Sequence, residues 1–154
     1  MDNSTALGAF LMSDSKTQNI IFINEEHKKF YDCMMQKSKY TDCYYKALFY
    51  TLGINSDTRN HVNEIYDFSV WCIKPECISS GWQTSGTLKT TRLAFNLFTD
   101  GVPTTEEFEN NYNEQLCECR KYSVSDLFCC DYAIYFIQAI CLRYPEYMKW
   151  GTIC

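Results

Sequence analysis

Four polar residues around one strongly apolar segment are the first candidates for chemistry. Arg92 and Asn96 are four residues apart, so on a helix their side chains project from the same face. Thr84 and Ser85 precede that segment and can cap its N-terminus, where backbone N–H groups attract anions. One interpretation is a small polar pocket or partner contact. The other is structural: the cap, together with an arginine bonded to loop carbonyls, locks the preceding turn.

An acidic segment is the second candidate, because residues 104–118 carry five glutamates and no lysine or arginine. Phe108 and Tyr112 are spaced so that aromatic side chains would share one helix face with these carboxylates. Aromatic anchors supply affinity in protein interfaces, and carboxylates steer towards a basic partner. The segment is interpreted either as a solvated helix face or as a partner-binding surface comprising Glu106, Glu107, Phe108, Glu109, Tyr112, Glu114 and Glu118.

Ten cysteines could bind metal, act as nucleophiles or form disulfides. Structural zinc commonly uses two Cys-x2-Cys or Cys-x4-Cys pairs, and only Cys72 with Cys77 fits that spacing. The remaining close pairs are Cys117 with Cys119 and Cys129 with Cys130. A disulfide is compatible with the spacings, but buried free thiols acting as small apolar side chains are the favoured interpretation. No metal or cofactor is therefore expected.

Sequence signatures of enzymes are missing. The chain has no phosphate-binding Gly-x-x-x-x-Gly-Lys loop, no dinucleotide fingerprint and no Gly-x-Ser-x-Gly elbow. A cysteine nucleophile needs a nearby base, and His27 and His61 are the only histidines. Neither has a local signature, and His27 is expected to be a surface or hydrogen-bonded core residue. The sequence favours a protein that is not an enzyme.

Composition limits the remaining classes. The chain has 154 residues, of which 46% are hydrophobic, enough for one domain with a real core. Its net charge of −5 argues against direct, sequence-independent nucleic-acid binding. The first 16 residues lack a basic export signal, and no apolar run approaches membrane-spanning length. We therefore expect a cytoplasmic chain that does not bind membranes.

The elements that position these residues are predicted to be helices. Apolar spacing and capping residues indicate helices over about 24–37, 41–52, 56–66, 87–98 and from Ser123 or Ser125 to Tyr144, with a short turn at 75–80. The apolar run 19–23 is either a strand or a lead-in to the first helix. Gly53 and the Asp100–Gly101 pair are expected to end helices. Residues 1–18 are predicted to be a polar N-terminal extension.

The predicted fold is mostly α: one compact helical domain over residues 19–154, with five or six helices and at most a minor short strand. No linker, repeat or second domain is evident.

Several motifs together resemble a known family. They are Phe22–His27, Tyr44–Leu52, Ile65–Phe68, Gly81–Ser85, Arg92–Phe98 and Ser125–Phe128. The pattern is similar to DUF 6075, an uncharacterised Firmicutes family of domains of unknown function, over roughly residues 20–145. The resemblance implies a loose association with phages and mobile elements and supplies no catalytic residues. The chain differs in its N-terminal extension, its cysteines and its acidic segment.

The sequence predicts a small helical protein-interaction module with a protein partner that has a basic surface. The sharpest hypothesis is an inhibitor of a bacterial nucleic-acid-binding defence complex, comparable to an anti-CRISPR protein, because such targets have basic channels. The alternatives are a structural zinc or thiol-dependent protein, and an enzyme that uses Thr84, Ser85, Arg92 and Asn96.

Overall fold

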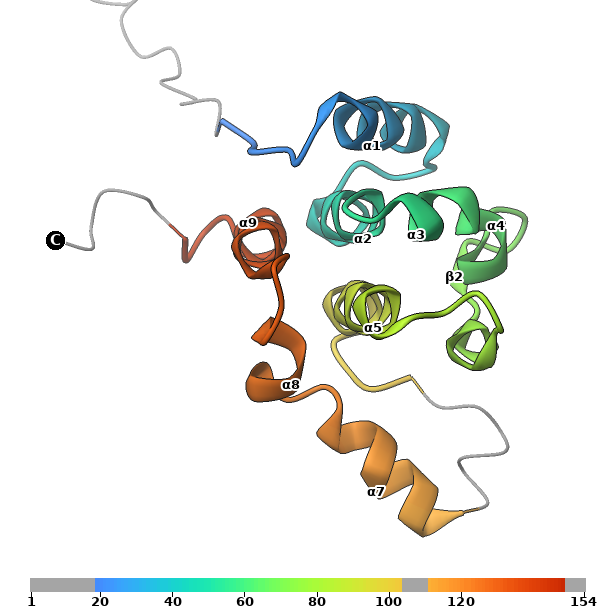
Figure 1. The fold of residues 1–154 in the computed structure, drawn as a ribbon. Helices are drawn as coiled ribbons and strands as arrows, with labels where there is room; N and C mark the ends of the chain where they lie inside the picture. The colour runs from blue at the N-terminus through green and yellow to red at the C-terminus, as the bar shows by residue number, and fades with distance from the viewer. Residues whose placement is uncertain (1–18, 104–110, 149–154) are drawn as a thin grey trace, which may run out of the picture.

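Helices form nearly all of the regular structure (Figure 1). The computed structural model describes residues 19–103 and 111–148, so the predicted extension 1–18 lies outside it. The elements are α1 (Glu25–Lys37), α2 (Cys43–Gly53), α3 (Ser56–Asn60), α4 (Val62–Ile65), β1 (Tyr66–Asp67), β2 (Cys72–Ile73), the 3-10 helix η1 (Pro75–Ser79), α5 (Ser85–Thr99), α7 (Tyr112–Arg120), α8 (Val124–Phe128) and α9 (Ala133–Arg143).

The mostly helical fold class is confirmed. The described residues hold eight α-helices rather than five or six. Two expected helices are each divided: 56–66 becomes α3 and α4, and 123–144 becomes α8 and α9. At the first break His61 leaves the helical conformation, with its ring Nδ1 2.8 Å from the Asp57 carbonyl oxygen and its plane stacked on Trp82. Side-chain contacts of this kind cannot be read from apolar periodicity.

Helix α2 lies at the centre of the fold. It packs against α1, α5 and α9, and Figure 1 shows it between α1 and α5 with α9 beside it. All residues from Tyr45 to Gly53 except Lys46 are buried, a wider surface than the single apolar stripe predicted. Each large apolar side chain buried so completely contributes about 1.5–3 kcal/mol relative to exposure.

Side chains fix the ends of the longer helices. Asn24 Oδ1 accepts a hydrogen bond from the His27 backbone N–H at 2.9 Å, so the predicted cap of α1 is confirmed. Asp42 caps α2 in the same way. The predicted end of α5 is also confirmed, although Asp100 rather than Gly101 adopts the left-handed conformation, with φ of 58°.

A buried histidine joins α1 to α2. His27 Nε2 lies 2.7 Å from the Tyr50 carbonyl oxygen, and Nδ1 accepts a hydrogen bond from the Ile23 N–H at 3.3 Å. One donor and one acceptor are the pattern of a neutral imidazole, and burial lowers the pKa of His27 to about 4. A Cβ on Gly53 would lie 2.5 Å from His27 Cδ2, so the close approach of α1 requires this glycine.

Arg143, at the end of α9, contacts both α2 and α5. Its Nη2 bonds both carboxylate oxygens of Asp100, at 2.8 and 3.0 Å, and its Nε donates to the Leu97 carbonyl oxygen. The guanidinium also covers the Tyr44 ring, 3.4 Å from the centroid, and Nη1 lies 3.5 Å from Cys43 Sγ. The start of α2, the end of α5 and the end of α9 therefore meet at one cation.

A small antiparallel hairpin, β1–β2, is the only sheet within the described residues. Its turn contains no Asn-Gly pair; Asp67 Oδ1 accepts hydrogen bonds from the backbone N–H groups of Ser69 and Val70 instead. Trp71 closes the turn with φ of 60°. The run 19–23 forms neither helix nor strand, which leaves the lead-in interpretation, and Phe22 packs against the core.

Candidate functional site

A buried ion pair joins the two candidate sites of the sequence. Arg92 on α5 and Glu118 on α7 are 5% and 2% exposed. Arg92 Nε lies 2.6 Å from Oε1 of Glu118, and Nη2 lies 3.1 Å from Oε2. Two parallel N–H···O bonds make this a bidentate contact, the strongest geometry available to these groups. Lys121 Nζ adds a third bond, 3.3 Å from Oε2.

Glu118 is therefore not part of a partner-binding surface, and that prediction is wrong for this residue. Both interpretations of the acidic segment, a solvated helix face or a partner-binding surface, place this carboxylate at the surface, whereas it is paired inside the molecule. Tyr112 and Glu114 are exposed, as the prediction requires. Glu106, Glu107, Phe108 and Glu109 lie outside the described residues.

The four residues of the predicted polar set do not converge. Thr84 forms a capping box with Thr87, in which the Thr84 N–H donates to Thr87 Oγ1 at 2.6 Å, so its capping role is confirmed. Ser85 is exposed in the first turn of α5. Asn96 Nδ2 donates to the Gly101 carbonyl oxygen at 3.0 Å. Arg92 bonds a carboxylate of α7 rather than the loop carbonyls expected.

Two further polar side chains lie beside the helices that carry this ion pair: Gln83 contacts Thr91 on α5, and Tyr122 follows α7. Gln83 Nε2 donates to the Cys77 carbonyl oxygen at 3.2 Å, whereas its Oε1 is buried without a hydrogen-bond partner. The hydroxyl of Tyr122 is buried and unpartnered as well. Burial and the neighbouring Glu118 carboxylate raise the pKa of Tyr122, which keeps the phenol neutral. Arg92, Glu118, Gln83 and Tyr122 thus connect neighbouring elements. They do not include a base placed next to a nucleophile.

Helix α7 is almost wholly exposed apart from Glu118. Tyr112 and Leu116 are 71% and 39% exposed and are four residues apart. Figure 1 shows α7 standing away from the central helices, beyond α5 and α8. The buried ion pair thus connects an exposed, partly apolar helix to the core.

Cysteines and histidines do not combine into a recognisable centre in residues 19–103 and 111–148. No group of three or more His, Cys, Asp or Glu side chains there could hold a metal. Of the zinc candidates, Cys72 is exposed on β2 and Cys77 is buried in η1. Burial raises the pKa of Cys77 to about 12, so its thiol is protonated at neutral pH. Both histidines bond to backbone carbonyls.

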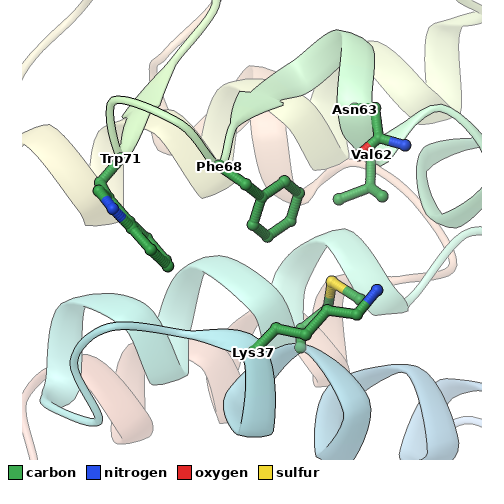
Figure 2. A pocket seen from close by; sticks show the side chains of 6 residues that line it. Lys37, Val62, Asn63, Phe68 and Trp71 are labelled. Carbon is green, nitrogen blue, oxygen red and sulfur yellow. The ribbon is translucent and has the colours of Figure 1, made fainter.

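A pocket that the sequence did not reveal lies between α1, α4 and the hairpin turn. It has a volume of about 410 Å³, and its lining residues are Met34, Lys37, Val62, Asn63, Phe68 and Trp71 (Figure 2). Phe68 and Trp71, the aromatic pair on the hairpin turn, could have indicated this pocket from the sequence. It could not be used because the hairpin itself was not predicted.

Comparison with known proteins places the chain in a family. Residues 17–152 match a family described as a family of unknown function (DUF6075). The chain belongs to this family. The DUF6075 match spans every element described above, including both partners of the ion pair and all residues that line the pocket.

The other comparisons add no relative to this DUF6075 member: no curated protein and no solved structure matches the chain. Among the helices of the described residues, none has both the length and the apolar character needed to cross a bilayer.

Proposed function

We propose that this chain is a small helical protein-interaction module that binds its partner through α7. The observation that carries the proposal is an exposed helix, with Tyr112 and Leu116 on its surface, held to the core by a buried bidentate ion pair. Two protruding apolar side chains, four residues apart, are the anchors of a helix that fits a groove on another protein.

Support for this surface comes from the way α7 is attached. Loss of one partner would leave the other charge buried and unpaired, at a cost of about 3–5 kcal/mol. Arg92 and Glu118 make this contact on the inner side of α7 and leave its outer side uncovered. A preformed helix loses less conformational entropy on binding than an unstructured peptide. The exposed side chains are therefore available in one fixed arrangement.

The charge of the surrounding sequence indicates the kind of partner. Glu114 is exposed on α7, and Glu106, Glu107 and Glu109 precede it in the sequence. Carboxylates beside apolar anchors favour a partner with a basic surface. A bacterial nucleic-acid-binding defence complex fits this description, and occupation of its basic channel would inhibit it as an anti-CRISPR protein does. Association of the family with phages or mobile elements is part of this proposal.

The test is an interference assay in bacterial cells that carry a nucleic-acid-guided defence complex, with plasmid survival as the readout. Expression of the chain should protect the plasmid, and Tyr112→Ser/Leu116→Ser should abolish that protection. The matched control is Ile134→Ser/Ile137→Ser, which changes two exposed apolar residues on α9.

Binding is then measured directly with the purified complex. Retention of the wild type and of the α9 variant, together with loss of the α7 variant, supports the proposal. If the α7 and α9 double variants bind equally or protect equally, the binding surface lies outside α7, and the proposed role of α7 is overturned. The absence of both protection and binding overturns the proposed partner class.

A further inference from the structure

We propose that the pocket between α1, α4 and the hairpin turn binds a small organic carboxylate with an aromatic or branched apolar body. Its volume of about 410 Å³ lies within the range of roughly 300–1,000 Å³ typical of small-molecule sites. Four of its six lining side chains are apolar or aromatic: Met34, Val62, Phe68 and Trp71. The other two are the potential donors Lys37 and Asn63.

The aromatic wall is fixed before any ligand arrives. The Phe68 ring is parallel to Phe49, at 6.0 Å and 4°, and meets Tyr66 edge-on at 5.0 Å. Phe68 is thus attached to the core on one side and lines the pocket on another. A wall that does not rearrange reduces the entropy lost when a ligand binds.

Trp71 reaches the pocket through an unusual backbone conformation. Its φ of 60° is uncommon for a bulky side chain, because the left-handed region is sterically unfavourable for a residue with a Cβ atom. The turn maintains it through a hydrogen bond from the Trp71 N–H to the Asp67 carbonyl oxygen at 2.8 Å. Glycine or asparagine would adopt this conformation more easily, so the turn itself does not require a tryptophan.

The two donors lie on the same side of the pocket. Figure 2 shows the Lys37 side chain passing below Phe68, with its ammonium on the side of Val62 and Asn63, while Trp71 lies at the opposite end. Within the described residues, no carboxylate forms a salt bridge with Lys37. By contrast, the nearby Lys74 bonds the Asn63 carbonyl oxygen and approaches Asp67.

This arrangement orients an amphiphilic anion. The apolar body would lie between Trp71 and Phe68, and the carboxylate would accept hydrogen bonds from the Lys37 ammonium and the Asn63 side-chain amide. A single unpaired ammonium matches a single negative charge. The pocket contains no residue of α7, so this inference is independent of the proposed function.

The experiment titrates the full chain with 4-phenylbutyrate and, separately, with 4-phenylbutanol, which has the same apolar body without the charge. Calorimetry gives the affinities, and the tryptophan indole N–H signals in NMR spectra locate the ligand. The acid should bind at least tenfold more tightly than the alcohol and shift the signal of Trp71 but not that of Trp82. Lys37→Met should reduce acid binding about tenfold and leave alcohol binding unchanged.

Lys39→Met is the matched control, because Lys39 is two residues away, lies over the Tyr40 ring and does not line the pocket. Its acid affinity should equal that of the wild type. Equal affinities for acid and alcohol, or equal losses in the two lysine variants, would overturn the carboxylate assignment. No binding of either compound at millimolar concentration, or shifts confined to Trp82, would overturn the site itself.

Discussion

Helix α2 buries every residue from Tyr45 to Gly53 except Lys46, whereas helix α7 buries a single side chain, that of Glu118. Both are regular helices of similar length with a side-chain cap at the N-terminus. α2 is held by apolar burial against three other helices, and α7 by a charged contact with one of them.

Two kinds of attachment thus allow one small chain to combine a tightly packed core with an exposed helix. Apolar burial involves many residues of a helix, so a helix stabilised in this way has most of its surface covered by its neighbours. A bidentate ion pair concentrates the attachment in two side chains and leaves the rest of the helix free.

Truncation in α2 should unfold the whole molecule more easily. Phe49→Ala removes a fully buried ring and should lower the free energy of unfolding by about 4 kcal/mol, measured by urea denaturation. Ile137→Ala, on the exposed face of α9, is the control and should change it by less than about 0.5 kcal/mol. Similar losses in the two variants would contradict the central role of α2.

Removal of one ion-pair partner should release α7. Glu118→Leu leaves the Arg92 guanidinium buried without its carboxylate and should cost about 3 kcal/mol. Hydrogen exchange should show lost protection in residues 112–120 and retained protection in α2. The double variant Arg92→Met/Glu118→Leu removes the unpaired charge and should recover part of the loss, whereas α7 should stay less protected because its attachment is still missing. Additive effects of the two single substitutions would show that the residues act independently.

Acid should weaken the contact between α1 and α2 specifically. The pKa of His27 is lowered to about 4 in the folded chain, against about 6.5 when unfolded, so protonation favours unfolding. Its contribution to stability is complete above pH 6.5 and is lost progressively as the pH falls towards 4. Between pH 6.5 and 5 the loss should be about 2 kcal/mol. His27→Gln should flatten this slope in denaturation experiments, whereas His61→Gln should retain it.

Substitution on the outer side of α7 should have almost no effect on folding. Tyr112→Ser and Leu116→Ser remove exposed side chains and should each change the free energy of unfolding by less than about 0.5 kcal/mol. Thermal unfolding provides the measurement. A loss above 1 kcal/mol for either variant would mean that α7 is held by more than its ion pair.

Much of the fold could be predicted because its signals are local. Asn24, Asp42 and Thr84 are capping residues directly before the helices they begin, and the apolar spacing within each helix is visible in the sequence. The division of two helices was missed, since a break such as His61 depends on contacts with Trp82, distant in sequence.

The candidate site was less predictable for the same physical reason. Arg92 and Glu118 were each identified as notable, but they were assigned to different sites because their pairing spans 26 residues. The pocket depends on three elements and on a strained Trp71 conformation that no residue preference indicates. Contacts between distant segments form the ion pair and the pocket, and the spacing of apolar residues along the chain does not indicate such contacts.

The Arg143 contact also bears on how long the folded chain persists. Its partners Asp100 and Cys43 are 43 and 100 residues away, so the contact closes two long loops of the chain. Interactions made after the folding transition state slow unfolding without accelerating folding. We therefore expect loss of the Arg143 contact to speed unfolding more than it slows folding.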